Sequence, residues 1–491
     1  MSAGRATMTP CVRVVARRFP VPSPAVRRAV AALAAEIRTT EPSIGDAGAF
    51  GPDVFKGCRP GPKVLFGDSG EIPLLAKASY NRLEYRFGFL AGEGDLVVVG
   101  DARHEAFERY QQRALALTRL DYMSVATRSR SRYRATPAAC LRDEAAYERL
   151  RRFTAEHDGT TLLAFLTSGT VWALAARLAA DTKCRIGVAG PPPLLSRRAN
   201  DKIWFGDIVA RLFGAGATPE KRAAHGWAAL VRHVGELAQE RDRLVIKVPD
   251  SAGSAGNCVV DCATVRDLGA RSLFDHLRGL FPEQMRGAPF PVAVEVWDVN
   301  VLTSPSVQVW IPDPSDGEPV IEGIFEQILI GAEGEFAGAA MAELPKEQDA
   351  LLAEQAFALS LLFQELGYFG RCSFDAVIAG TGPDVAQVHW IECNARWGGV
   401  SIPMSFANNT GRDGSFAVIQ CGQVSVTARP FEQALAVAEA AAPDGGAVLL
   451  SPNIIEAGTG CHFMAFGETP QKALHRARLV LRRVRADSRV S

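Results

Sequence analysis

The chain has 491 residues, of which 54 are Lys or Arg, 54 are Asp or Glu and 47% are hydrophobic. A chain of this length forms roughly two or three domains. Its balanced charge argues against a general attraction to nucleic acid or anionic lipid. No run of roughly eighteen uninterrupted apolar residues is present, which argues against a membrane-spanning helix. We therefore expect a cytoplasmic protein that binds neither nucleic acid nor membrane.

The ten cysteines are scattered along the chain, and none forms a C-x-x-C pair. Cys258 and Cys262 are closest in sequence, but no second pair and no neighbouring His completes a zinc site. We therefore expect reduced, mostly buried thiols.

The first 60 residues form an uneven, Pro-rich N-terminal segment with one helix-like run at residues 23–39. Ser23 suits the N-cap of that run, and Pro24 suits its first helical position. We therefore expect one helix in an otherwise irregular segment.

Residues 61–190 alternate buried apolar runs with helical stretches, in the segments 63–75, 94–101, 160–180 and 184–193. This alternation predicts a parallel α/β sheet. The stretch "GDSG" (67–70) has the letters of a serine-protease signature. Because it follows a strand of this sheet and no His–Asp partnership accompanies it, we interpret it as a turn.

Residues 191–425 mix helices with strands and form the second predicted domain. The pattern indicates helices at 200–214, 219–241, 266–281 and 345–366, strands at 243–249, 291–297, 306–311 and 323–329, and a hairpin at 371–394. Residues 426–491 read as helix, two strands and an amphipathic terminal helix, which predicts a small C-terminal α/β domain.

The hairpin places polar groups where a metal ion could bind. Asp375 and Glu392 lie symmetrically about the turn at 379–384, so in a simple hairpin they face each other about 5 Å apart, which is unfavourable for like charges. Asn394 projects from the same face as Glu392. Two carboxylates and an amide oxygen favour Mg²⁺ that shares its other positions with phosphates and water. The alternative is a surface hairpin with solvated polar ends; Arg396 weakens it, because a cation there indicates a further anion.

Two lysines and a small-residue loop suggest a phosphate site. Lys247 lies in an apolar strand, where an ammonium needs an anion. The loop 250–257 is rich in Gly and Ser, which lets backbone amides approach phosphates, although it is no Walker A sequence. Lys202 begins a helix, where the helix dipole disfavours a positive charge. Glu295 is a charged residue within an otherwise apolar strand. The alternatives are a flexible loop beside an edge-strand lysine, a solvated Lys202, and an edge strand that exposes Glu295.

In this order along the chain, these features resemble the ATP-grasp superfamily over residues 186–425. The segment "RCSFDAVI…HWIECNARWGG" is similar to the metal-binding hairpin of D-alanine–D-alanine ligase and biotin carboxylase. The motifs "KVLFGDSGEIPLL" and "GVAGPPPLLSRRANDK" resemble the pre-ATP-grasp domain of pheganomycin-type peptide ligases, and residues 426–491 resemble their C-terminal domain. The implied fold class is α/β and α+β, with an ATP-grasp fold behind a Rossmann-like pre-ATP-grasp domain and a small C-terminal domain.

The resemblance implies a role for each matching residue. Mg²⁺ would be held by Asp375, Glu392 and Asn394. ATP would be bound by Lys202, Lys247, Ser251, Gly253, Ser254, Gly256, Asn257, Glu295, Trp297 and Gln327, with Glu295 and Trp297 in the adenine pocket. Arg396 and Lys247 would be catalytic, with Arg396 stabilising the acyl phosphate and its tetrahedral adduct. One departure is Ser373, where D-alanine ligases carry arginine; the acceptor geometry can therefore differ from theirs.

The implied activity is an ATP-dependent carboxylate–amine ligase that forms a peptide bond through an acyl phosphate, as in natural-product biosynthesis. Its partners would be an acid and an amine, such as amino acids or peptides, and the enzyme could be a homodimer. Two alternatives stay open, an ATP-dependent carboxylase and a nucleotide-binding relic without activity. The carboxylase should come with a biotin-carrier domain or a biotin-carrier partner, and the sequence shows no such domain. Arg197 and Arg198 could meet a substrate carboxylate or form a solvated face.

Overall fold

The computed structural model describes residues 6–8, 12–16, 22–72, 79–100, 102–129, 132–133, 135–251, 256–281, 290–331, 334–382, 386–412, 414–421 and 426–485. Gly253 and Ser254, predicted to contact ATP, lie outside these residues. Within the described part of the chain, no helix is long and apolar enough to cross a bilayer.

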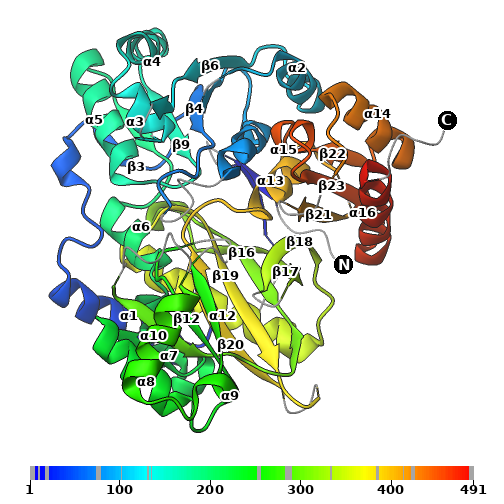
Figure 1. The fold of residues 1–491 in the computed structure, drawn as a ribbon. Coiled ribbons are helices and arrows are strands. Elements are labelled where there is room, and N and C mark those ends of the chain that lie inside the picture. The colour runs from blue at the N-terminus through cyan, green and yellow to red at the C-terminus, as the bar shows by residue number, and fades with distance from the viewer. Residues whose placement is uncertain are drawn as a thin grey trace.

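A six-stranded parallel sheet forms the first lobe, drawn in blue to cyan in Figure 1. Its strand order is β3-β10-β9-β4-β5-β6. The strands are β3 (Val54–Lys56), β4 (Lys63–Phe66), β5 (Leu96–Gly100), β6 (Asp121–Val125), β9 (Thr160–Ala164) and β10 (Ile186–Val188). One face packs on α3 (Thr136–Cys140), α4 (Glu144–Glu156) and α5 (Gly169–Thr182). The sheet confirms the predicted parallel α/β region, because every neighbouring pair of strands is parallel.

Several short elements complete this lobe and the N-terminal segment. They are β1 (Ala6–Met8), β2 (Arg13–Val15), β7 (Arg128–Ser129), β8 (Arg132–Tyr133), α2 (Glu105–Ala114) and the 3₁₀ turns η1 (Gly48–Phe50) and η2 (Ser79–Leu90). The "GDSG" stretch is a turn after β4, as expected, and the Asp68 carboxylate accepts a hydrogen bond from the Gly70 amide at 2.6 Å.

The N-terminal helix forms as predicted and is part of the core. The helix α1 (Pro24–Thr40) begins at Pro24, and the Ser23 side chain accepts from the Val26 amide. Its apolar residues Val30, Leu33 and Ile37 join the core beneath the large sheet. Among the described cysteines, seven are free and buried, as expected; Cys58 differs, because it is disulfide-bonded.

A four-stranded antiparallel sheet forms the small lobe, in green in Figure 1. Its strand order is β11-β14-β12-β13. The strands are β11 (Lys221–Ala224), β12 (Arg243–Lys247), β13 (Asn257–Asp261) and β14 (Val292–Val296). It is covered by α8 (Trp227–Leu237), α9 (Cys262–Val265) and α10 (Ala270–Leu280). The helix predicted at 219–241 is therefore wrong in its first turns. Residues 221–224 pair with β14 instead, because that places the Lys221 ammonium against buried Glu295.

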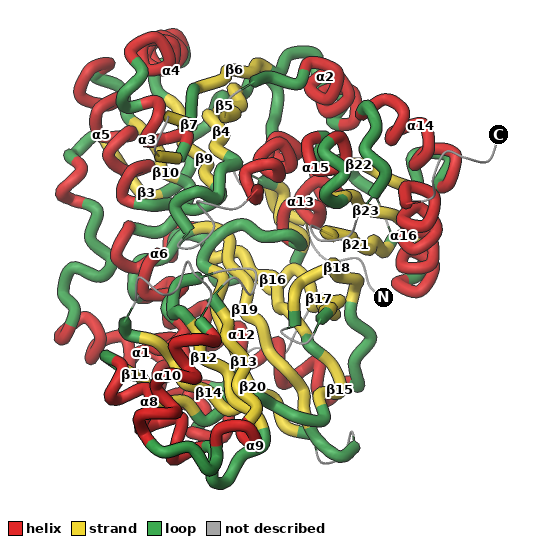
Figure 2. Tube along the Cα trace, viewed as in Figure 1, coloured by secondary structure: helices red, strands yellow, loops and turns green. Residues whose placement is uncertain are grey.

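A nine-stranded sheet runs through the centre of the molecule, and its strands β16, β19 and β20 lie among the yellow strands at the centre of Figure 2, beside those of the small sheet. Its order is β15-β19-β16-β17-β18-β21-β23-β22, with β20 on the other edge of β19. The strands are β15 (Val301–Thr303), β16 (Pro305–Ile311), β17 (Val320–Ile330), β18 (Glu335–Met341), β19 (Gly370–Ala379), β20 (Gln387–Asn394), β21 (Ser415–Cys421), β22 (Ala447–Leu449) and β23 (Cys461–Gly467). All its pairs are antiparallel. The strands of region 426–491 thus continue the sheet that carries the predicted metal hairpin.

Helices pack around this sheet. They are α6 (Pro193–Asn200), α7 (Lys202–Phe213), α12 (Lys346–Glu365), α13 (Ser401–Asn409), α14 (Phe431–Ala441), α15 (Asn453–Glu456) and α16 (Pro470–Arg485), with 3₁₀ turns η3 (Ala215–Ala217) and η4 (Pro314–Asp316). The sequence predicted α7, α12, α14 and α16 but not α6, whose first residue, Pro193, was read as the end of a strand. Pro suits the first position of a helix, because the amide hydrogen that it lacks would have no hydrogen-bond partner within the helix.

A buried ion pair ties the large sheet together. Arg371 on β19 pairs with Glu322 on β17, and both side chains are 0% exposed. The guanidinium also lies 5.4 Å from the Trp310 ring centre and 5.0 Å from that of Trp397. We expect Arg371→Met to lower the free energy of unfolding by about 3–5 kcal/mol, because it leaves a carboxylate buried without its partner.

Thermal and urea unfolding measure this loss. The control is Arg38→Met, which removes a surface pair with Glu365 and should cost no more than about 1 kcal/mol. Equal effects of the two variants would contradict a stabilising role for the buried pair.

Candidate functional site

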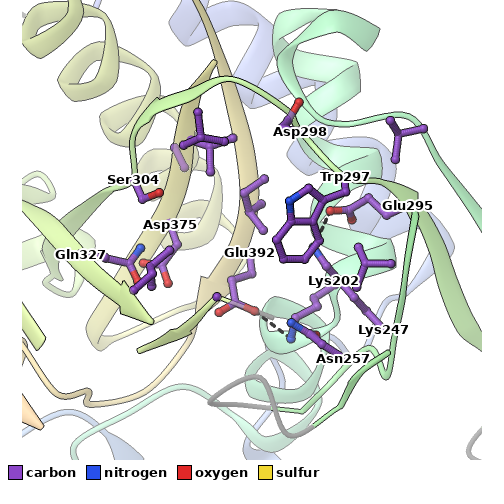
Figure 3. Close-up of a pocket in the computed structure, with 18 of the residues that line it drawn as sticks. Lys202, Lys247, Asn257, Glu295, Trp297, Asp298, Ser304, Gln327, Asp375 and Glu392 are labelled. Atoms are coloured by element: carbon purple, nitrogen blue, oxygen red, sulfur yellow. Dashed lines mark hydrogen bonds and ion pairs between the residues drawn. The ribbon is translucent and has the colours of Figure 1, made fainter. Parts of the chain in front are cut away.

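A cavity of about 320 Å³ lies between the small sheet and the large sheet. Figure 3 shows that side chains from both sheets point into it. Its polar and aromatic lining consists of Lys202, Lys247, Ser251, Asn257, Glu295, Trp297, Asp298, Ser304, Gln327, Asp375 and Glu392. Nine predicted site residues are in this set; Gly256, Asn394 and Arg396 lie outside the lining. The fold thus brings together residues separated by up to 190 positions in the sequence.

The two hairpin carboxylates face each other as predicted. Asp375 on β19 is the cross-strand partner of Glu392 on β20. The register shifts directly beyond this pair, because Ala376 pairs with Trp390 and leaves Ile391 as the extra residue. The bulge lies on the turn side of the pair, so it does not separate the carboxylates. It also lets both Ile391 and Glu392 line the cavity.

Asp375 carries a carboxylate whose charge is poorly compensated. Its Oδ1 accepts from the Ser306 hydroxyl at 2.6 Å, and its Oδ2 accepts from the Asn394 amide nitrogen at 2.9 Å. Burial, followed by the charge of Glu392, raises the pKa of Asp375 to about 7 despite these two hydrogen bonds. A cation placed between the carboxylates would favour the charged form.

Glu392 is neutralised by Lys202, whose ammonium lies 2.8 Å from Glu392 Oε2. Burial would raise the pKa of Glu392, but the charge and hydrogen bond of Lys202, together with the charges of Arg396 and Lys247, lower it. Lys202 is the first residue of α7 and is 5% exposed. The helix dipole disfavours a cation there, and the lysine is held by Glu392 and the Ser251 carbonyl, at 2.9 Å.

Lys247 belongs to a second buried charge cluster. Its ammonium pairs with Glu295 across the small sheet, and Lys221 lies 3.4 Å from the other carboxylate oxygen of Glu295. Burial would raise the pKa of Glu295, but Lys247 and Lys221 together lower it. Burial lowers the pKa of Lys221. Glu295 therefore holds two lysines as well as lining the cavity, a contact the sequence did not suggest.

The sequence did not single out Asp298 and His389. Asp298 follows Trp297 and lines the cavity, and its Oδ1 lies 2.8 Å from His389 Nδ1 on β20. The two residues are 91 positions apart, so no local pattern could connect them. The Trp297 ring stacks with the Arg243 guanidinium at 4.8 Å, which leaves an aromatic wall with a fixed orientation.

Arg396 lies beside the first cavity and lines a second one. Its guanidinium donates to the side-chain oxygens of Asn394 and Asn200, and burial lowers its pKa. The second cavity has a volume of about 280 Å³ and lies between α6 and the loop that precedes α5. Of the described residues predicted to bind metal or nucleotide or to be catalytic, Arg396 alone is in its lining, together with Arg197, one of the two arginines considered for a substrate carboxylate.

The donor set suits a hard metal ion only in part. Within the described residues, no group of three or more His, Cys, Asp or Glu side chains could hold a metal, and the predicted set has two carboxylates and one amide. Asn394 Oδ1 currently accepts from Arg396, so Asp375 and Glu392 are the ligands the geometry favours. Oxygen ligands of this kind suit Mg²⁺ with phosphates and water in its other positions.

Comparison with known proteins identifies the fold. The family model described as the pre-ATP-grasp domain matches residues 84–180. No curated protein matches the sequence significantly. The solved structures that are similar over most of the chain include three with a bound nucleotide.

The biotin carboxylase of Campylobacter jejuni, in complex with a β,γ-ATP ligand, has a TM-score of 0.54 and 15% identity, covering 89% of this chain and 92% of its own. The biotin carboxylase domain of Hydrogenobacter thermophilus 2-oxoglutarate carboxylase, with MgADP and bicarbonate, has a TM-score of 0.52 and 14% identity, covering 86% and 89%. The N5-carboxyaminoimidazole synthase of Aspergillus clavatus, with ADP and 5-aminoimidazole ribonucleotide, has a TM-score of 0.51 and 12% identity, covering 86% and 99%.

At these identities the comparison establishes the fold alone. The chain has a mixed α/β architecture in which a parallel-sheet pre-ATP-grasp region precedes the antiparallel sheets of an ATP-grasp fold. This confirms the predicted fold class.

Proposed function

We propose that this ATP-grasp fold is an ATP-dependent ligase that joins a carboxylic acid to an amine. One observation carries the proposal. Two buried lysines, Lys202 and Lys247, and two facing carboxylates, Asp375 and Glu392, line a single cavity although they come from a helix and two different sheets. Burying ion pairs such as Lys202–Glu392 has a desolvation cost that their attraction offsets only in part, and a nucleotide triphosphate with a divalent cation is a ligand that would use charges of both signs.

The chain's own residues divide naturally between the parts of ATP. The ammonium groups of Lys202 and Lys247 bind the phosphates, and Ser251 and Asn257 close the loop side of the cavity. Trp297 contacts the adenine ring, because an aromatic face favours stacking. Asp298 and Gln327 are polar groups for the ribose and the remaining edges. The present partners of both lysines are carboxylates, so phosphate binding exchanges one anion for another.

The metal would be held by Asp375 and Glu392, with Asn394 beside them. When bound, Mg²⁺ would neutralise negative charge on the phosphate oxygens. The raised pKa of Asp375 supports this assignment, since burial and Glu392 disfavour its charged form until a cation is present.

The reaction follows from the charges that these residues provide. A carboxylate oxygen of the acid attacks the γ-phosphorus, the bond from phosphorus to the β–γ bridging oxygen breaks, and ADP leaves with the electron pair. A neutral amine then attacks the acyl carbon, the carbon–oxygen bond to phosphate breaks, and the amine nitrogen loses one proton. Arg396 and Lys247 stabilise the negative charge that develops in both steps. The acid and the amine are amino acids or peptides in this proposal.

An assay of ADP release tests the proposal. The enzyme is given MgATP with pairs of amino acids, and the products are identified by mass spectrometry. We expect ADP and phosphate to form only when both an acid and an amine are present, with one amide product. ADP release that needs bicarbonate would identify a carboxylase, and no release with any pair would identify a nucleotide-binding relic.

Removal of Mg²⁺ is expected to abolish turnover and to weaken nucleotide binding. Without the cation, two carboxylates and three terminal phosphate oxygens repel each other in a buried cavity. Calorimetric titration with ATP in EDTA and in excess Mg²⁺ measures the binding directly. Equal affinity under both conditions would contradict a metal-bridged nucleotide.

A further inference from the structure

The second cavity adjoins the nucleotide cavity along three segments of chain. Asn200 lines the second cavity and Lys202 the first; Asp250 lines the second and Ser251 the first. Arg396 lines the second cavity and donates to Asn394, which contacts Asp375. A molecule in the second cavity would therefore lie next to the site proposed for the terminal phosphates.

The lining of this cavity carries charges of both signs without internal partners. Arg197, Glu71 and Asp250 make no hydrogen bond or ion pair through their side chains to described residues. Within the described residues, the hydrogen-bond partners of the Arg396 guanidinium are the neutral amides of Asn200 and Asn394. A site that offers unpaired guanidinium and carboxylate groups together is complementary to a zwitterion.

The size and walls of the cavity restrict the ligand further. Its volume of about 280 Å³ lies just below the roughly 300–1,000 Å³ range of ligand sites, which favours a small ligand over a long peptide. Ile72, Leu166 and Pro193 provide a partly apolar wall. The N-terminus of α5 also opens here, with Ser168 as N-cap and no acidic residue in its first turn, which adds positive potential.

We propose that this second cavity binds a single α-amino acid, the acid substrate, with its carboxylate toward Arg396 and Arg197 and its ammonium toward Asp250 and Glu71. The orientation rests on the proposed ligase reaction, because the carboxylate has to reach the γ-phosphate. The two acidic residues keep the α-amino group charged, and a protonated amine is not a nucleophile. The arrangement thus also prevents this amino acid from serving as the amine in the second step.

Direct binding tests the assignment without turnover. The full chain is saturated with Mg²⁺ and a non-hydrolysable ATP analogue and titrated with each common L-amino acid by calorimetry or ligand-observed NMR. We expect selected amino acids to bind, and for the tightest of them the des-amino acid and the carboxamide to bind at least about ten-fold more weakly, because each leaves a charged group unpaired.

Variants locate that binding. Arg197→Met and Asp250→Asn should each weaken the amino acid at least about ten-fold while ATP-analogue affinity stays unchanged. The matched control is Arg198→Met, because Arg198 pairs with Glu41 at 2.7 Å outside the cavity and should leave amino-acid binding unchanged. Absence of amino-acid binding, equal binding of the des-amino acid, or wild-type binding in both variants would overturn the assignment.

The ADP assay separates this inference from the proposed function. Binding with the expected pattern but no ADP release with any amine would keep the amino-acid site and reject the ligase. ADP release with acids that lack an amino group, undisturbed by Arg197→Met and Asp250→Asn, would keep the ligase and reject the site.

Discussion

Glu392→Gln should lower kcat/KM at least about 10²–10³-fold, the loss typical when one preorganised electrostatic group is removed from a site. The glutamine keeps the shape of the side chain but removes the charge that faces Asp375 and pairs with Lys202. A metal ion held by these carboxylates would lose one of its two anionic ligands. Steady-state ADP release and calorimetric titration with Mg²⁺ and ATP measure both consequences.

The folded structure is expected to tolerate this change. Glu392 and Asp375 are like charges on paired strands, so the substitution relieves a repulsion, and Lys202 keeps its contact with the Ser251 carbonyl. The thermal unfolding midpoint should therefore stay near that of the wild type. Glu365→Gln, which changes an exposed residue, serves as the control and should turn over normally. Wild-type turnover in Glu392→Gln would remove this carboxylate from the mechanism.

Lys247→Met should reduce turnover by at least about 10²-fold and raise the dissociation constant for ATP. Lys247 is 5% exposed and lines the nucleotide cavity, where its charge interacts more strongly with a phosphate than it would in water. Methionine retains much of the packing volume. Steady-state kinetics and equilibrium binding of an ATP analogue distinguish a loss of binding from a loss of rate.

The structure supplies a matched control for this variant. Lys221 also pairs with Glu295, but it is absent from the cavity lining. We expect Lys221→Met to disturb Glu295 in a similar way and to retain most of the turnover. If the two variants lose activity equally, the ion pairs of Glu295 matter and direct contact of Lys247 with phosphate does not.

The sequence predicted the pairing across the hairpin well because its signals are local. The dense turn at 379–384 and the two-residue period of strands placed Asp375 opposite Glu392, and the structure pairs them. Lys247 was recognisable because a charged residue within a buried strand is costly. The roles assigned to these residues stay predictions until they are measured.

Contacts between distant segments could not be predicted in the same way. Lys221 was assigned to a helix, because nothing local shows that residues 221–224 pair with β14 some 70 positions later. The contact of Asp298 with His389 and the charges around the second cavity have the same origin, since each joins segments that meet only in the folded chain. The strands of region 426–491 also gave no sign that they extend the large sheet, because edge pairing leaves no periodicity of its own.

Transfer of labelled oxygen tests the central claim most directly. An acid substrate carrying ¹⁸O in its carboxylate is incubated with MgATP, the enzyme and an amine, and the released phosphate is analysed by mass spectrometry. The account predicts that each phosphate contains one ¹⁸O atom and that ADP forms in equal amount, because the acid oxygen becomes the bridge to phosphorus. Unlabelled phosphate, or release of AMP and pyrophosphate in place of ADP, would contradict it.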